Sequence, residues 1–264
     1  MLQNVVVKSP IQLKDHDPAE DFGLKKEKTR QATRRLLERI GGLQAKLYAN
    51  TRRSVLVVLQ GMDASGKDGS IRSVLQGVNP AGVETANFKV PSAEESAHDY
   101  LWRIHHAVPR RGSIGVFNRS HYESVLAERV LGIVPKKVWR PRYAEIVTFE
   151  RFLAANHVVV LKFYLHLSRD EQAARFKERL ANPKKFWKFA HADLTTRQHW
   201  DDYHAAYEDM LNATSHPAAR WHLIPADRNW YRDYLIATTV VRALESLHLK
   251  WPKRCQDFAD IRVT

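Results

Sequence analysis

A short apolar run is followed at once by a glycine-rich loop that ends in lysine. Residues 55–59 are apolar, with three β-branched valines, and after Gln60 comes Gly61-x-x-x-x-Gly66-Lys67. The order strand, glycine loop, helix is typical of a P-loop, because the glycines let backbone N–H groups turn toward a phosphate. Lys67 adds a positive charge to those amides. The sequence therefore predicts a phosphate-binding loop over residues 61–69.

Two acidic residues distinguish this loop from the common nucleotide-binding one. Asp68 stands where Ser or Thr normally offers a hydroxyl to Mg²⁺, and Asp63 lies inside the loop. A carboxylate among amides that bind phosphate is unfavourable unless a metal ion or another cation lies between them. The two acids therefore indicate a cation at the loop.

A second motif, Asn118-Arg119, ends the apolar run 112–117. In an open parallel sheet the ligand lies at the carboxyl ends of the strands, and in P-loop enzymes an acid here usually holds Mg²⁺. Taken alone, Asn-Arg at a strand end could equally well be a cap and a surface charge without a role in chemistry. Beside a P-loop, the pair favours a role facing the substrate.

Phosphoryl transfer requires positioning and positive charge around the moving group. Arginines that could reach it are Arg129 at a helix end and Arg175 and Arg179, which lie four apart on one helix face. For each of the three, an exposed basic helix face is an equally good interpretation.

A basic, aromatic segment without a clear period covers residues 181–195. Its Lys184, Lys185, Trp187 and Lys188 would suit a lid that closes over phosphates. The same mixture would suit single-stranded nucleic acid with bases stacked on Trp187 or Phe189. A third interpretation, in which the aromatic side chains only pack the lid against the body, is expected for at least one of them.

Strand and helix alternate around these motifs. Helices are predicted over 23–50, after the P-loop, from the Ser92–Glu95 capping box through His106, and over 120–130, 142–156, 169–180, 196–211 and 230–247. Strands are predicted over 55–60, 83–90, 112–117, 157–166 and 221–225. The alternation indicates an α/β fold with a parallel sheet between helical layers. We expect an extended arm over 1–22, one domain over 23–250 and a tail over 251–264.

Composition limits the class of protein. The chain has 264 residues, of which 44% are hydrophobic, and it has no apolar run of the ~20 residues that span a membrane. No secretory signal is visible and Cys255 is the single cysteine, so we expect an inert thiol and a cytoplasmic protein without a membrane partner. The net charge of +13 predicts a polyanionic partner, with a mere solubility surplus as the alternative.

At this point the chain resembles the polyphosphate kinase 2 family from about Gly23 to Leu247. The motifs that carry the resemblance are Gly-Met-Asp-Ala-Ser-Gly-Lys-Asp-Gly at 61–69, Asn-Pro-Ala-Gly-Val at 79–83, Phe-Lys-Val-Pro-Ser-Ala-Glu-Glu at 88–95, Phe-Asn-Arg-Ser-His-Tyr-Glu at 117–123, Trp-Lys-Phe at 187–189, Trp-Asp-Asp-Tyr at 200–203 and Pro-Ala-Asp-Arg at 225–228. The Asp after the loop lysine is a feature of this family's P-loop. Asn229 departs from the family, in which a basic residue is common at that position.

The resemblance implies a thymidylate-kinase-like three-layer αβα P-loop fold with a helical lid at about 181–200. It implies reversible phosphoryl transfer between inorganic polyphosphate and a nucleotide with Mg²⁺, or Mn²⁺ in its place. Asn-Arg, where other members have Asp-Arg, resembles class III members, which phosphorylate AMP and ADP. Adenine and guanine nucleotides, and a homodimer or homotetramer, are further expectations; a nucleic-acid partner is not.

The resemblance also implies roles for individual residues. Asp63 would bind the metal, and the catalytic group would comprise Asp63, Lys67, Arg119, Arg129 and Arg179. The expected phosphate- and nucleotide-binding residues are Gly61, Ala64, Ser65, Gly66, Asp68, Gly69, Lys89, Asn118, Glu123, Arg175, Lys184, Lys185, Trp187 and Lys188.

Two alternatives to a polyphosphate-dependent nucleotide kinase stay open. An ATP-dependent nucleoside monophosphate kinase shares the fold and the strand-end arginine, but it predicts Ser or Thr after Lys67. A basic single-stranded nucleic-acid-binding protein would use the lid, but it gives the P-loop and Asp63 no task.

Overall fold

The computed structural model describes residues 5–8 and 10–253, and its centre is a parallel sheet. The strand order is β2-β3-β1-β4-β5, and all four strand pairs are parallel. The strands are β1 (Ser54–Gln60), β2 (Val83–Asn87), β3 (Ile114–Asn118), β4 (Val158–His166) and β5 (Trp221–Pro225). The predicted α/β architecture is confirmed.

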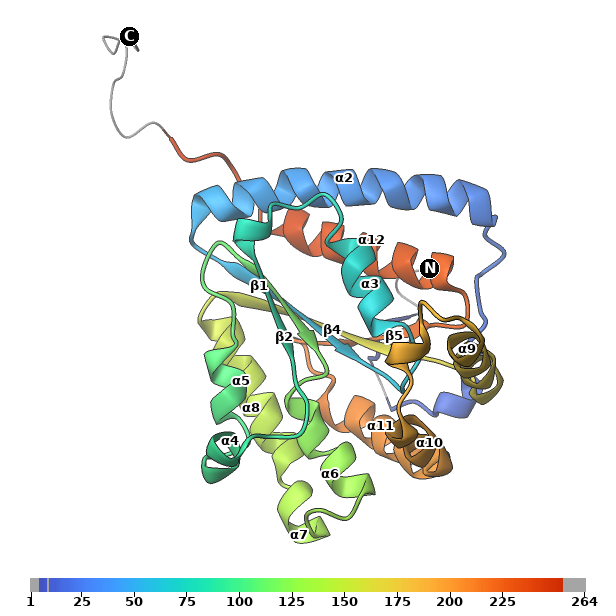
Figure 1. Ribbon diagram of the computed structural model, residues 1–264. Helices are drawn as coiled ribbons and strands as arrows, with labels where there is room; N and C mark the ends of the chain where they lie inside the picture. Colours follow the sequence, from blue (N-terminus) through green and yellow to red (C-terminus); the bar gives the residue numbers. More distant parts are fainter. Residues whose placement is uncertain (1–4, 9, 254–264) are drawn as a thin grey trace, which may run out of the picture.

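Helices cover both faces of this sheet (Figure 1). One layer consists of α2 (Lys26–Asn50), α3 (Lys67–Val74) and α12 (Asn229–Ser246). The other consists mainly of α5 (Trp102–His106), η3 (His121–Ser124), α6 (Ala127–Val130), α8 (Arg142–Ala155) and α11 (Trp200–Thr214). Shorter elements are η1 (Leu13–Asp15), η2 (Pro80–Gly82), α4 (Ala93–Ala97) and α7 (Lys136–Trp139).

The central strand β1 explains why the site forms where it does. All seven residues of β1 are buried; Val55, Val57 and Leu59 pack with α2 and α12, whereas Leu56 and Val58 pack on the opposite face. Burial on both faces is the reason that this strand is a continuous apolar run. Leu59 pairs with Asn118 at the end of β3, so the two predicted motifs begin side by side.

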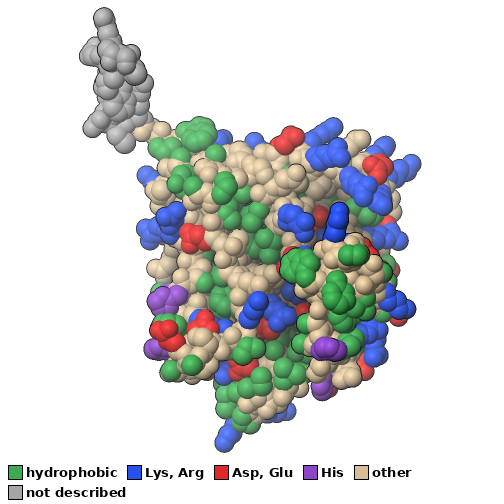
Figure 2. All heavy atoms as spheres, in the orientation of Figure 1, with side chains coloured by type: hydrophobic (Ala, Val, Ile, Leu, Met, Phe, Trp, Pro, Cys, Tyr) green, Lys and Arg blue, Asp and Glu red, His purple; other side chains and the backbone are tan. Residues whose placement is uncertain are grey.

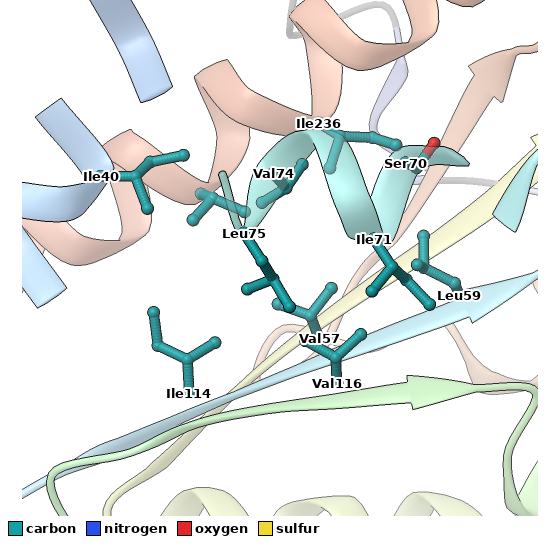
Figure 3. A pocket seen from close by; sticks show the side chains of 11 residues that line it. Ile40, Val57, Leu59, Ser70, Ile71, Val74, Leu75, Ile114, Val116 and Ile236 are labelled. Carbon is teal, nitrogen blue, oxygen red and sulfur yellow. The ribbon is translucent and has the colours of Figure 1, made fainter. Parts of the chain in front are cut away.

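The P-loop helix α3 lies on β1 and β3 over a small apolar cavity (Figure 3). Its volume is about 10 Å³, and its lining consists of aliphatic side chains such as Ile71 and Val116, with Ser70 as the polar exception. A space of this size holds at most about one water molecule. The cavity is therefore a packing gap beneath the loop and does not bind substrate.

In the first half of the chain, three predicted elements differ from the structure. The helix predicted through His106 is broken into α4 and α5, because His98 is extended and the Asp99 carboxylate accepts a hydrogen bond from the Leu101 amide. The helix predicted over 120–130 is η3 followed by α6, and Leu126 between them has non-helical dihedrals. The second strand ends at Asn87 rather than 90, where its partner β3 also ends.

The segment predicted as an interruption over 181–195 contains helical structure. After α9 (Arg169–Ala181) it forms η4 (Phe186–Lys188), and α10 (His191–Gln198) begins inside it. The predicted helix 196–211 is thus the end of α10 and most of α11. We call residues 182–198 the lid segment. Figure 1 shows it beside the carboxyl end of β1, at the right of the view.

The described part of the N-terminal arm packs along β5 and α11. Val6 forms an antiparallel bridge with His222, and the Leu13 amide donates to the Glu208 carboxylate over 2.7 Å. Val5, Val7 and Leu13 are buried, so this arm contributes to the core. The predicted tail over 251–264, including Cys255, lies outside the described residues beyond position 253. Within the described ranges, no helix is both long and apolar enough to cross a membrane.

Candidate active site at the carboxyl ends of β1 and β3

The loop between β1 and α3 has the backbone geometry of an anion-binding turn. Gly61, Ala64 and Gly66 all have positive φ, of 150°, 64° and 98°. Gly66 is the N-cap residue of α3, so the loop delivers its amides to the positive end of a helix. A Cβ on Gly61 would lie 2.8 Å from the Leu165 carbonyl oxygen, so the loop packs tightly on β4 as well.

Lys67 is buried beneath this loop. Its Nζ donates hydrogen bonds to the carbonyl oxygens of Gly61 over 2.6 Å and Met62 over 3.1 Å. Burial lowers the pKa of Lys67 to about 8, although the neighbouring Asp63 carboxylate acts in the opposite direction. The ammonium group is therefore fixed by the backbone of the loop that it serves, in a place where its charge is weakly screened.

Arg119 and Asp63 form the ion pair at the centre of the site. Arg119 Nη2 donates to Asp63 Oδ1 over 2.8 Å, and the Asp63 side chain is 16% exposed. Burial alone would lower the pKa of Arg119, but the carboxylates of Glu123 and Asp63 outweigh it and raise that pKa. Burial raises the pKa of Glu123, and the charges of Arg119 and Lys67 oppose that shift. Two cations and two carboxylates thus meet here.

Asp68 joins the P-loop to the end of β3 and to the lid segment. Its Oδ1 accepts a hydrogen bond from Asn118 Nδ2 over 2.8 Å, and its Oδ2 lies 3.9 Å from Lys188 Nζ. The acid that replaces the usual Ser or Thr therefore has two partners in the predicted site. The Asn118 amide is oriented by this contact.

The donor set suits Mg²⁺ in the manner usual for phosphate-transferring enzymes. Over the described ranges, no group of three or more His, Cys, Asp or Glu side chains could hold a metal ion by itself. Mg²⁺ normally keeps several waters and is bound by one or two carboxylates together with substrate phosphates. The partly exposed Asp63 carboxylate, between the P-loop amides and Arg119, fits that requirement.

The lid segment contacts α9 and interacts electrostatically with the loop region. Arg179 Nη1 lies 3.9 Å from Asp193 Oδ2, and the Asp193 carboxylate interacts electrostatically with Asp63 and Arg119. Phe189 packs on Phe176 of α9, as expected for at least one lid aromatic. Figure 2 shows Lys and Arg side chains over α2 and around the hollow beside the lid.

Three further side chains brace the P-loop through its carbonyl oxygens. Arg175 donates to Ala64, Ala226 and Asp227 carbonyls and to Glu171, so its guanidinium is committed to the loop's support. Gln172 donates to the Asp63 carbonyl over 2.9 Å, and Arg232 donates to the Ser65 carbonyl over 3.2 Å. The phosphate contact predicted for Arg175 stays a prediction; the geometry adds a supporting role.

Sequence reasoning missed Gln172, Arg232 and Asp193. None of them belongs to a spaced motif, because each lies on a helix that is distant from the loop in sequence. The sequence signal that comes nearest is the family motif Pro-Ala-Asp-Arg at 225–228, since Arg175 and α12 anchor there.

Some predicted residues contact other parts of the structure. Arg129 pairs with Asp209 over 2.7 Å, bonds Tyr143 and stacks on Trp139, so its described contacts are with α7, α8 and α11. Lys89 follows β2 and is exposed, as are Lys184 and Lys185. Lys185 pairs with Glu178, and Trp187 is 76% exposed. For these side chains to play their predicted roles, a bound ligand or a movement of the lid segment would have to bring them to the loop.

Comparisons with known proteins agree with this geometry. A family model described as Polyphosphate kinase 2 (PPK2) matches residues 23–251. An AMP/ADP-polyphosphate phosphotransferase from Meiothermus ruber is 49% identical over 245 residues, which is 92% of each chain. An ADP-polyphosphate phosphotransferase from Rhodopseudomonas palustris is 45% identical and covers 86% of this chain and 83% of its own.

A solved structure gives the same result for the fold. The crystal structure of Polyphosphate Kinase 2 from Arthrobacter aurescens TC1 superimposes with a TM-score of 0.94 at 37% identity. The match covers 97% of this chain and 93% of the other, so the helical layers and lid segment are included as well as the sheet. The chain belongs to the polyphosphate kinase 2 family.

Proposed function

We propose that this enzyme transfers a phosphoryl group reversibly between inorganic polyphosphate and adenine nucleotides, forming ADP from AMP and ATP from ADP. The observation that carries the proposal is the Asp63–Arg119 pair, 2.8 Å apart, above the P-loop that holds Lys67. Positive charge and a partly exposed carboxylate meet there, as transfer between two phosphate chains requires. The relatives named above support the same donor and acceptors.

The residues divide the chemical task between them. The transferring group spreads its charge over three oxygens, so catalysis depends on positioning and electrostatic stabilisation. Lys67 and the loop amides would hold phosphates of one substrate, and Arg119 would face the group in transit. Mg²⁺ bound at Asp63 would neutralise phosphate oxygens. Gln172 and Arg175 keep the loop in the shape that presents these groups.

The direct test supplies ADP, Mg²⁺ and long-chain polyphosphate, with no other phosphoryl donor, and measures ATP. We expect ATP formation that depends on both polyphosphate and enzyme. A parallel reaction of ATP with AMP, without polyphosphate, tests the alternative nucleoside monophosphate kinase. Activity confined to that second reaction would overturn the proposal. A panel of AMP, ADP, GMP, GDP, CMP and UMP then tests our further proposal that guanine nucleotides are accepted.

The acceptor specificity is proposed to depend on Asn118. AMP presents a phosphate that lies one position nearer the nucleoside than the terminal phosphate of ADP. Both must reach the same donor end near Asp63 and Arg119, so the site must tolerate the nucleotide at two depths. A neutral side chain at 118 adds no charge near the acceptor, and its amide is bonded to Asp68.

Asn118→Asp is expected to impair AMP phosphorylation at least tenfold more than ADP phosphorylation. The new carboxylate would face Asp68 at hydrogen-bond distance and add negative charge close to the acceptor. At ~4 Å and an effective dielectric of 20, one charge pair amounts to about 4 kcal/mol before screening. A third of that is about tenfold in kcat/KM. The measurement is kcat/KM for both acceptors.

Asn118→Ala is the matched control, because it removes the hydrogen bond to Asp68 without adding charge. We expect the ratio of AMP to ADP kcat/KM to change less than about twofold in this variant. A shift as large as that of Asn118→Asp would show that the bond to Asp68, rather than charge, selects the acceptor. An unchanged ratio in both variants would remove Asn118 from acceptor choice.

We further propose that the protein acts in the cytoplasm, where its nucleotide substrates are, and assembles as a homodimer or homotetramer. Leu131, Ile133 and Val138, around α6 and α7, have exposed fractions of 48%, 64% and 39%, and such apolar side chains favour a contact between copies. Light scattering across a range of protein concentrations would measure the oligomeric state.

A further inference from the structure

A fully buried group of polar side chains lies behind the strand-end motif. Glu150 of α8 accepts hydrogen bonds from the Tyr122 hydroxyl over 2.7 Å and from Lys162 Nζ over 2.6 Å. Lys162 of β4 also donates to the Tyr122 hydroxyl over 2.9 Å and to the Thr214 carbonyl over 2.8 Å. Glu150, Lys162 and Tyr122 each have no exposed surface. We call these three residues the buried triad.

Two histidines complete the contacts of Glu150. His216 Nε2 lies 2.9 Å from one carboxylate oxygen and His121 Nε2 lies 3.3 Å from the other. Burial alone would raise the pKa of Glu150, but Lys162 and His121 lower it, so the carboxylate is ionised. A buried ion pair is a poor source of stability, because removing two charges from water offsets most of their attraction. The triad therefore calls for another explanation than stability.

The triad binds the turn that carries the catalytic side chains. His121 and Tyr122 lie between Arg119 and Glu123 in sequence, and both bond Glu150. Arg119 has a φ of 62°, a left-handed conformation that a residue with a side chain adopts only when its surroundings enforce it. From the other side, the Arg119 amide donates to the Leu59 carbonyl over 3.2 Å. The turn is thus held between β1 and the triad.

We propose that Glu150, Lys162 and Tyr122 are positioning residues that fix this turn so that Arg119 and Glu123 face Asp63 and Lys67. The triad touches no reacting atom and acts through Tyr122. The identity of the reaction rests on the proposed function, whereas the placement of the turn does not. Loss of the triad's hydrogen bonds should therefore lower kcat and loosen residues 119–124, while nucleotide affinity changes little.

Tyr122→Phe is the mildest test, because it removes the shared hydroxyl and keeps the ring that packs on Trp221 at 4.8 Å. The matched control is Tyr164→Phe, since the buried Tyr164 hydroxyl has no hydrogen-bond partner among the residues described. We expect kcat for ADP with polyphosphate to fall at least tenfold in Tyr122→Phe and less than twofold in Tyr164→Phe. KM for ADP should stay within about threefold in both.

Glu150→Gln tests whether the triad acts through Tyr122. If it does, the double variant Glu150→Gln/Tyr122→Phe should lose less kcat, relative to wild type, than the product of the fold-losses of the two single variants. Multiplied effects would mean that Glu150 acts by another route and would overturn the proposal. Circular dichroism melts of each variant allow kcat to be compared well below the onset of unfolding.

Hydrogen exchange followed by mass spectrometry supplies a readout that does not depend on the reaction. We expect faster exchange of the 119–124 amides in Tyr122→Phe than in wild type or Tyr164→Phe. Unchanged exchange together with unchanged kcat in folded Tyr122→Phe would overturn the triad's positioning role. Failure of the wild-type enzyme to make ATP would contradict the proposed function instead, and the exchange comparison would still decide the role of the triad.

Discussion

Lys67→Met and Asp63→Asn are each expected to lower kcat by about 10²–10³ while the protein remains folded. Preorganised charges that stabilise a transition state are typically worth that factor. Lys67 Nζ is fixed by two loop carbonyls, and Asp63 is bound by Arg119, so each charge is held in one place in the site. Methionine retains the length of lysine and asparagine the shape of aspartate, so each variant mainly removes charge.

The measurement is kcat and KM for ADP and polyphosphate, with Lys26→Ala as the control. Lys26 is exposed at the start of α2, so its loss tests the general effect of removing one positive charge. We expect that control to retain activity within about twofold. Either site variant with more than about a tenth of the wild-type kcat would contradict the assignment of the P-loop.

The pKa of Lys67 gives the same prediction a pH dependence. Burial lowers it to about 8, so Lys67 loses its proton in the free enzyme above pH 8, and kcat/KM should fall there. The free energy of unfolding changes with pH in the opposite direction. Between pH 8 and the unfolded value of 10.5, the unfolded chain binds more protons, so wild type should gain stability relative to Lys67→Met as pH rises. If the free energies of unfolding of the two proteins changed with pH in parallel, burial would not have lowered the pKa of Lys67.

The parts of the site that are local in sequence could be predicted from it. Residues 61–69 follow β1 directly, residues 118–119 lie at the end of β3, and parallel strands end at one edge of the sheet. Their meeting therefore follows from the alternation of strands and helices. The Asp68–Asn118 hydrogen bond is a consequence of that adjacency, although the residue types alone did not specify it.

The supporting residues could not be predicted, because they depend on packing between distant elements. Lys162 lies in a strand that otherwise reads as apolar, and its partner Glu150 comes from a preceding helix. Sequence also cannot distinguish an arginine that binds phosphate from one that binds carbonyl oxygens. Arg175 shows this, since a basic helix face predicts both arrangements; the structure shows its bonds to carbonyl oxygens, and its phosphate contact stays a prediction.

Gly66→Ala is expected to lower kcat/KM by at least 100-fold. It should also lower the melting temperature by more than backbone strain alone would lower it. Gly66 has a φ of 98°, and an added Cβ would lie 1.9 Å from Arg232 Nη1. Arg232 is only 3% exposed and is held by Ser65, Asn229 and Asp233, so its guanidinium cannot turn into solvent. Relief of the clash must therefore displace the start of α3 and the phosphate-binding amides. A misplacement of about 1 Å typically costs ~10²-fold in rate.

Gly77→Ala is the control that separates strain from collision. Gly77 has a φ of 84°, and nothing lies within 4 Å of its added Cβ. Alanine in a left-handed conformation costs about 1 kcal/mol, which is roughly 3 °C in melting temperature for a chain of this size. We expect Gly77→Ala to show that loss with normal kcat/KM, and Gly66→Ala to exceed it. Equal losses of stability in the two variants, with kcat/KM preserved in both, would mean that the P-loop accommodates a side chain at 66 and that Arg232 does not fix its shape.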